Sequence, residues 1–340
     1  MSIEVFQHRI REAQRSGTAL RLRGGGSKDF YGNALRGEVL DTRAYAGIVT
    51  YEPTELVITA RCGTALSEME SILEKQNQFL PFEPPHFGEG ATIGGCVAAG
   101  LSGPRRAAVG ALRDFVLGAK VIDGRGSVLA FGGQVMKNVA GYDVSRLMAG
   151  SLGTLGLIAE VSLKVLPKPR GEATVLLELP EQKALDTMAA WASQPLPITA
   201  TAWHDGRLAV RVDAKAAGKL SSTKSEFDWP ALRDQRHDFF SGEKPLWRIA
   251  VPPTTPPLPL GAQLIEWNGA LRWLRSDAPA SEIRAAAARA KGHATLFRAA
   301  DKSAGAFAPL NPVLARLHRE MKSAFDPAGV LNPGRLLAEF

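Results

Sequence analysis

The spacing of hydrophobic and polar residues divides the first half of the chain into short, separate elements. Ile3, Phe6 and Ile10 recur at three- and four-residue steps, which predicts an amphipathic helix over 3–16. A similar periodicity predicts a second helix over 64–78. β-Branched or alternating runs predict strands at 20–23, 39–42, 47–52, 54–60, 115–122, 127–131 and 158–165. This mixture of strands and helices is typical of an α+β fold.

The second half shows the same mixture with different connections. Strands are predicted at 174–179, 198–203, 207–212, 262–267 and 270–274. Helices are predicted over 181–193 and over 281–291, the second capped by Ser281. Asn268-Gly269 is a hairpin signal, so we expect a small antiparallel sheet with helices on one face. The proline-rich stretch at 252–259 predicts a stiff linker or surface loop, and docking of a partner is the alternative.

Composition and charge narrow the class of protein. The 340 residues are 45% hydrophobic and 22% charged, which is typical of soluble proteins and is long enough for two domains. The formal charge of +7 suits an anionic cofactor, an acidic partner, a nucleic acid or a membrane surface. Lys and Arg are scattered rather than interleaved with aromatic residues, which disfavours nucleic acid. No apolar run reaches the roughly 18 residues of a membrane span, so we expect a cytoplasmic chain.

Cysteine and histidine offer little metal or redox chemistry. Cys62 and Cys96 are too few for a disulfide framework and too far apart for an iron–sulfur or zinc motif, so we expect reduced, structural thiols. The six histidines form no pair at helical or strand spacing, so the sequence predicts no metal site.

A triple glycine follows the first predicted strand. Gly24, Gly25 and Gly26 leave backbone amides uncovered, and Ser27 and Lys28 add a hydroxyl and a charge. Successive bare N–H groups form an anion-binding concavity, so the stretch predicts a turn that holds a pyrophosphate. A plain loop is the alternative reading of the same residues.

Two later stretches are also poor in side chains. Prolines at 81–85 lead into small residues from Gly88 to Gly100, which favours either a ligand or close helix packing. Within this stretch, His86 is expected to be a loop residue. A third stretch contains 137–143 and then 150–158, where glycines recur at three-residue steps before a strand.

The common nucleotide motifs do not fit these stretches. Asp29, Ile93 and Leu129 stand where the third glycine of a Gly-x-Gly-x-x-Gly motif would be. No Gly-Lys-Ser/Thr follows a spaced glycine either. Rossmann and P-loop folds are therefore disfavoured.

Three segments, 23–27, 90–95 and 153–158, together resemble the FAD-binding domain of the vanillyl-alcohol oxidase and p-cresol methylhydroxylase (PCMH) family. The resemblance implies bound flavin adenine dinucleotide (FAD). It implies that these residues contact the cofactor: Arg23, Gly24, Gly25, Gly26, Ser27, Lys28, Gly90, Ala91, Thr92, Ile93, Gly94, Gly95, Ala98, Ala99, Gly100, Gly153, Thr154, Gly156, Leu157 and Ile158. Ser27 replaces the histidine that holds the flavin covalently in some relatives, so non-covalent FAD is expected.

The tail at 325–335 resembles the closing motif of the 2-hydroxy-acid dehydrogenase branch. We interpret the turn at 102–106 as an exposed basic turn. With this turn and its short length, the chain most resembles the smaller FAD-binding subunit of bacterial glycolate oxidase. This resemblance implies oxidation of glycolate or another small 2-hydroxy acid within a complex, with hydride passing to FAD. The implied partners are a larger FAD-containing catalytic subunit and an iron–sulfur subunit. Attachment to the cytoplasmic membrane is then at most peripheral, at its inner face and through the complex.

The resemblance also implies the architecture. A two-subdomain FAD-binding (PCMH-type) domain is expected at 1–170, a small antiparallel α+β cap-like domain at 171–305, and a C-terminal helix returning to the flavin domain at 306–340. The Pro167-Lys168-Pro169 stretch marks the first boundary.

Catalysis by this chain alone is less well supported. Relatives that are catalytic carry a Glu-His-Gly segment and further histidines, whereas His293 is the single histidine of the corresponding stretch, 291–296. It is a weak candidate for a base, because a lone histidine without a carboxylate partner is often structural. The alternatives are a non-catalytic flavin-binding scaffold and a free-standing D-lactate or aldonolactone dehydrogenase.

Overall fold

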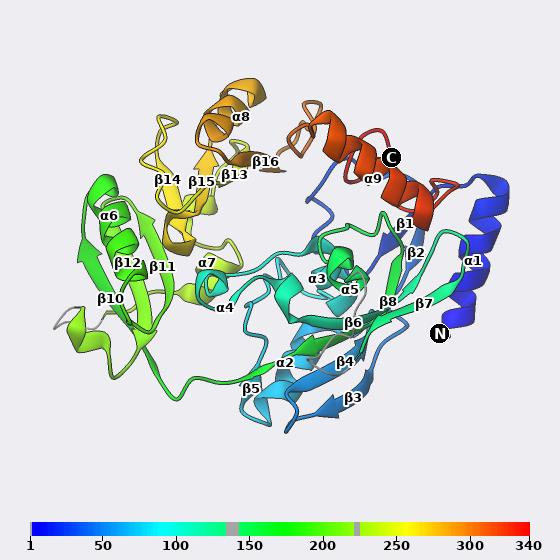
Figure 1. Cartoon of the computed structure of the whole chain (residues 1–340), viewed down its shortest axis with the longest axis horizontal. Helices are drawn as coiled ribbons and strands as arrows, with labels where there is room; N and C mark the ends of the chain where they lie inside the picture. The colour runs from blue at the N-terminus through cyan, green and yellow to red at the C-terminus, as the bar shows by residue number, and fades with distance from the viewer. Residues whose placement is uncertain (1, 134–142, 221–224) are drawn as a thin grey trace. The chain divides into compact units, whose positions relative to one another are not determined.

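The computed structural model describes residues 2–133, 143–220 and 225–340 (Figure 1). Internal contacts divide the chain into two compact units. The first contains Met1–Leu101, Ala111–Lys168 and Pro309–Phe340, and the second contains Ser102–Gly110 and Pro169–Ala308.

The N-terminal helix of the first unit follows the predicted hydrophobic spacing. Helix α1 spans Ile3–Ser16 and buries Phe6, Ile10 and Ala13 at four- and three-residue steps. Gly17 ends the helix in the left-handed conformation at φ 70°. The helix predicted over 3–16 is therefore confirmed.

A five-stranded antiparallel sheet forms the larger part of the first unit, in the order β3-β4-β8-β6-β7. Its strands are β3 (Ile48–Glu52), β4 (Val57–Arg61), β6 (Val116–Ile122), β7 (Val128–Gly132) and β8 (Leu157–Lys164). The predicted strand at 54–60 begins late, because Leu56 has φ 58° in the turn that precedes β4. The β6–β7 hairpin is closed by Asp123, whose Oδ1 accepts from the backbone amides of Arg125 and Ser127.

A second, smaller layer of the first unit contains a parallel pair of strands, β1 (Leu20–Arg23) and β2 (Glu38–Asp41). A short antiparallel pair also forms, β5 (Gln78–Phe79) with β9 (Leu166–Pro167). Besides α1, the helical segments of this unit are α2 (Leu66–Glu74), α3 (Ile93–Ala99), η1 (Leu112–Phe115), α5 (Val144–Met148) and α9 (Pro312–Phe325). Helix α2 is shorter than predicted over 64–78, because Asn77 at φ 52° turns the chain into β5.

The C-terminal tail closes the core of the first unit. After α9, the backbone of Leu331 forms a parallel bridge with Leu20 of β1. Leu331 and Val330 are buried in one cluster with Phe6 and Ile10 of α1. The expected C-terminal helix that returns to the first unit is therefore confirmed, as Figure 1 shows.

The second unit is built on a seven-stranded antiparallel sheet in the order β10-β12-β11-β14-β15-β13-β16. Its strands are β10 (Glu172–Glu178), β11 (Ile198–His204), β12 (Arg207–Asp213), β13 (Leu246–Ala250), β14 (Gln263–Glu266), β15 (Leu271–Arg275) and β16 (His293–Arg298). Its helical segments are α4 (Arg106–Val109), α6 (Glu181–Ala192), η2 (Ala217–Lys219), α7 (Trp229–Arg233), η3 (Asp238–Phe240), η4 (Trp267–Gly269) and α8 (Ala280–Arg289). Strands β13 and β16 were not predicted.

The two long helices of this unit share one face of the sheet. Ile265 packs against α6 and Leu274 against α8. Ile265 pairs with Arg272, two residues from Leu274, so both helices cover the same face. The opposite face is also covered, since Phe240 of η3 contacts the Trp273 ring at 5.5 Å between centroids. The prediction of helices on one face thus holds for α6 and α8 only.

Two local predictions in the second unit were wrong. Pro279, rather than Ser281, occupies the N-cap of α8, and no side chain caps this helix end. The 102–106 turn is not an exposed basic turn, because Arg105 is only 5% exposed and its guanidinium pairs with Glu172 at 2.5 Å. Trp267 anchors the same segment by donating from Nε1 to the Gly103 carbonyl at 3.0 Å.

Candidate functional site

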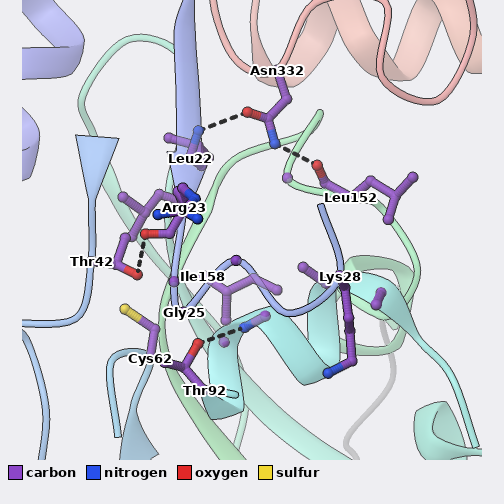
Figure 2. Close-up of a pocket in the computed structure, with 18 of the residues that line it drawn as sticks. Leu22, Arg23, Gly25, Lys28, Thr42, Cys62, Thr92, Leu152, Ile158 and Asn332 are labelled. Atoms are coloured by element: carbon purple, nitrogen blue, oxygen red, sulfur yellow. Dashed lines mark hydrogen bonds between the residues drawn. The ribbon is translucent and has the colours of Figure 1, made fainter. Parts of the chain in front are cut away.

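A pocket within the first unit brings the three glycine-rich stretches together. Its empty space is about 800 Å³, open solvent at its mouth included. Its lining is formed by Leu22, Arg23, Gly24, Gly25, Gly26, Ser27, Lys28, Asp29, Leu35, Thr42, Cys62, Thr92, Gly94, Gly95, Ala98, Ala99, Leu152, Gly153, Gly156, Leu157, Ile158, Asn332 and Arg335. Figure 2 shows many of these side chains around the turn that carries Gly25.

The triple-glycine turn follows β1 and depends on the absence of Cβ atoms. A Cβ on Gly25 would overlap the Gly90 carbonyl oxygen, and one on Gly24 would overlap the Thr92 hydroxyl. Gly26 has φ 76°, a conformation that other residues rarely adopt. The turn therefore needs glycine at all three positions, and its backbone reaches the pocket directly.

The second stretch enters the pocket through α3. Thr92 is its N-cap, and the Thr92 hydroxyl accepts from the Gly95 amide at 3.3 Å (Figure 2). A Cβ on Gly94 would lie 2.6 Å from the Cβ of Cys62, so Gly94 lets the helix approach its neighbour closely. Ala98 and Ala99 line the pocket. Close helix packing, one of the two readings of this stretch, is therefore confirmed, and space for a ligand beside the small residues stays a prediction.

The third stretch forms the wall from Leu152 to Ile158. Its backbone is tied to α3, because the Leu152 amide donates to the Ala98 carbonyl at 2.9 Å. Gly153 has φ 72°, and a Cβ there would lie 2.7 Å from Asn332 Nδ2. Residues 137–142 of the predicted third stretch lie outside the described residues.

Asn332 joins two walls of the pocket. Its Oδ1 accepts from the Leu22 amide at 2.7 Å, and its Nδ2 donates to the Leu152 carbonyl at 2.6 Å. Figure 2 shows the side chain between these two backbone groups. Asn332 and Arg335 were not among the predicted site residues, although both lie in the tail motif at 325–335 on which the resemblance rested.

Charged groups gather at the glycine turn. Arg23 pairs through Nε with Asp29 at 3.0 Å, and Arg335 Nη2 donates to the Asp29 carbonyl at 2.8 Å. Burial lowers the pKa of Arg335 to about 10, against the opposing effect of Asp29. Lys28 Nζ donates to the Ser27 hydroxyl at 3.3 Å. An excess of cationic groups over Asp29 suits an anionic ligand such as a pyrophosphate.

Five predicted site residues support the pocket without lining it. The Gly90 carbonyl is the atom that excludes a side chain at Gly25. Ala91 and Ile93 are buried, and the Ala91 carbonyl accepts from the Leu66 amide at 2.7 Å. The other two are Gly100, packed against Gly150, and Thr154, whose carbonyl is held by a buried lysine.

Other candidate groups lie elsewhere. His293 belongs to β16 of the second unit and is not part of the pocket lining in the first. Desolvation and the charge of Arg248 lower the pKa of His293. Burial raises the pKa of both Cys62 and Cys96 to about 12, which suits structural thiols. Within residues 2–133, 143–220 and 225–340, no three His, Cys, Asp or Glu side chains cluster as metal ligands would.

Comparison with known proteins connects this pocket to a family. Residues 2–132 match the family model described as FAD binding domain. The chain is 49% identical over 99% of its length to glycolate oxidase subunit GlcE of Escherichia coli strain K12, covering 97% of that protein. The chain belongs to the GlcE family of glycolate oxidase subunits. The resemblance to this family is thereby confirmed, as are the FAD-binding domain and the oxidoreductase class.

Two further proteins are similar to this GlcE-family chain. Glycolate oxidase subunit GlcD of Bacillus subtilis strain 168 is 31% identical over 52% of this chain and 38% of its own length. Among solved structures, an alkyldihydroxyacetonephosphate synthase matches with a TM-score of 0.67 at 15% identity, covering 98% of this chain and 76% of that one. At this identity, the match supports the α+β fold alone.

The pocket fits FAD on features of its own. A glycine turn, cationic groups and an apolar wall in one pocket suit a dinucleotide with a pyrophosphate. Arg23, Ser27 and Lys28 would hold the phosphates, and Ala98, Leu157 and Ile158 would contact the rings.

Proposed function

We propose that this GlcE-family chain is the FAD-binding subunit of a glycolate (2-hydroxy acid) dehydrogenase complex that oxidises glycolate to glyoxylate. The observation that carries the proposal is 49% identity along 99% of the chain to a glycolate oxidase subunit. The glycine-lined pocket supports it, because its side-chain-free turn and cationic lining residues suit the pyrophosphate of FAD.

The chain's own residues bind and orient the cofactor in this proposal. The amides of 24–27 and the charge of Lys28 hold the pyrophosphate, and residues 152–158 place an apolar wall along the flavin. FAD held here would supply a group that accepts electrons originating from the 2-hydroxy acid and releases them to the next carrier. With Ser27 in the position of an attachment histidine, FAD is held without a covalent bond.

Partners are part of the proposal. The names of the GlcE and GlcD relatives describe subunits, which supports a multi-subunit complex. In this proposal a larger FAD-containing subunit oxidises the acid and an iron–sulfur subunit accepts the electrons. This chain relays the electrons from the first subunit to the second. In the described residues, no helix is long and apolar enough to cross a membrane. The proposed location is the cytoplasm with peripheral attachment through the complex, which cell fractionation checks.

Reconstitution of the complex tests the proposal. The full complex is assembled with this chain as wild type or as Gly25→Trp, whose indole would fill the glycine turn. We expect Gly25→Trp to lose flavin from this chain and to lower the rate of glycolate-dependent dye reduction. Unchanged activity after loss of that flavin would instead identify the chain as a scaffold.

A free-standing dehydrogenase is the second candidate. A D-lactate dehydrogenase of Anaerostipes hadrus is 35% identical over 42% of this chain and 29% of its own length. The purified single chain, supplied with FAD, a dye and either glycolate or D-lactate, separates the two functions. Turnover by the chain alone would support the free-standing enzyme and contradict dependence on partners.

A further inference from the structure

Lys322 of α9 is a buried cation that holds the wall of the flavin pocket from behind. Its Nζ donates to the Thr154 carbonyl at 2.8 Å, to the Leu331 carbonyl at 2.8 Å and to Asp326 Oδ2 at 2.7 Å. A protonated lysine has three N–H donors, so these three acceptors use all of them. The side chain is 6% exposed and that of Asp326 is 0% exposed.

Asp326 fixes the other end of the same network. Its Oδ2 also accepts from the Leu331 amide at 2.7 Å, and its Oδ1 accepts from the Val330 amide at 3.2 Å. Lys322 and Asp326 thereby hold the tail strand that places Asn332 between Leu22 and Leu152. Through Asn332, the network connects Leu22 of β1 with the wall at 152–158, and these two segments are more than 100 residues apart in the chain.

We propose that Lys322, paired with Asp326, is a positioning residue that sets residues 152–158 at the distance required to bind FAD. The inference rests on the proposed function of the pocket. Neither side chain lines the pocket, so any effect on FAD must pass through the Thr154 carbonyl and the tail.

Stability alone does not explain a charged pair at this place. Replacing a buried ion pair by apolar residues of similar volume is often neutral or stabilising, whereas removing one partner leaves an uncompensated charge. What an apolar pair cannot supply is a directed donor to the Thr154 carbonyl. We therefore expect the Lys322–Asp326 pair to contribute more to the fixed geometry of the wall than to the free energy of unfolding.

The test compares Lys322→Met with the double variant Lys322→Met/Asp326→Leu in the full-length chain. FAD affinity is measured by titration of the apoprotein, and hydrogen exchange reports on residues 152–158 without FAD. We expect about a tenfold rise in Kd for FAD and faster exchange in both variants, because the Thr154 carbonyl loses its buried donor. The double variant removes the uncompensated charge of Asp326 but leaves the amides of Val330 and Leu331 without their acceptor, so it should regain part of the thermal stability and none of the affinity. Recovery of both thermal stability and FAD affinity in the double variant would show that the pair is merely structural. If Lys322→Met does not fold, the FAD affinity of the double variant alone tests the inference.

Arg272 provides the matched control. It is a fully buried cation of the second unit, with Nε donating to the Gly269 carbonyl at 2.7 Å and Nη2 to the Thr255 carbonyl at 2.8 Å. Arg272→Met should lower thermal stability with an unchanged Kd for FAD. Equal weakening by Arg272→Met and Lys322→Met would overturn the inference. If wild type binds no FAD, the proposed function fails; if wild type binds and Lys322→Met binds equally well, only this inference fails.

Discussion

Replacing Gly25 by alanine adds one methyl group where the glycine turn meets the backbone of a second segment. The new Cβ would overlap the carbonyl oxygen of Gly90, which is backbone and cannot rotate away. One of the two chain segments must therefore move. Because both segments lead into residues that line the pocket, the movement alters the site itself.

The expected magnitude follows from the cost of overpacking. Forcing extra volume into a well-packed region costs about 1–3 kcal/mol. If this cost falls on the FAD-bound state, Kd for FAD rises about 5-fold to 140-fold, at about 1.4 kcal/mol for each factor of ten. If it falls on both states, the free energy of unfolding decreases by the same amount and affinity changes less.

Titration of apoprotein with FAD and thermal unfolding separate these cases. Gly171→Ala is the control, because a Cβ on Gly171 would meet the Cβ of Ala214 at 3.6 Å, an ordinary contact. Gly171→Ala should change neither quantity, within about 0.5 kcal/mol. Equal behaviour of Gly25→Ala and Gly171→Ala in both assays would refute the close approach at Gly25.

Three further predictions follow from the same structure. Asn332→Ala should lower the free energy of unfolding by about 1–3 kcal/mol for each of the two backbone groups left unpaired, measured by denaturant titration, and should weaken FAD binding. Asn332→Gly should be less destabilised than Asn332→Ala, because Asn332 has φ 43°, which glycine adopts without strain. An unchanged midpoint in Asn332→Ala would contradict the bridge. Burial and the nearby charge of His204 lower the pKa of His237 below 6.5, so the folded state resists protonation and stability is lost as pH falls below that value. His237→Gln should therefore flatten the decline of the thermal midpoint as pH falls below about 6.5. An identical pH profile in the variant would exclude His237 as a source. Cys62 and Cys96 should not react with a thiol reagent at neutral pH until the chain unfolds, because burial raises the pKa of each to about 12; rapid modification of the native chain would contradict their burial.

Local sequence patterns predict the elements whose order depends on near neighbours. The helix at 3–16 and the hairpin at 115–131 follow from residue spacing and turn residues alone. Strands β13 and β16 were missed because they depend on strands distant in the chain: β13 pairs with β15 and β16, and β16 pairs with β13. Helix α2 was predicted too long because the turn at Asn77 depends on the pairing of β5 with β9.

The residues of the candidate site also differ in whether local sequence predicts them. The glycine-rich stretches are visible because missing side chains are a property of each stretch, and the structure brings them to one pocket. Asn332 is not visible in this way, because its partners Leu22 and Leu152 lie more than 150 residues away in the chain. The contact of Lys322 with Thr154 is equally distant, although Asp326 and Leu331, its other partners, are near in the chain. The buried charge of Arg105 was misread for the same reason, since Glu172 is 67 residues distant.

The most direct measurement is the amount of FAD bound to the purified full-length chain, read from its absorbance before and after acid precipitation. The account predicts one FAD per chain, all of it released into the supernatant. A colourless chain that takes up no added FAD would contradict a pocket built for this cofactor, and flavin retained on the precipitated polypeptide would contradict its non-covalent binding.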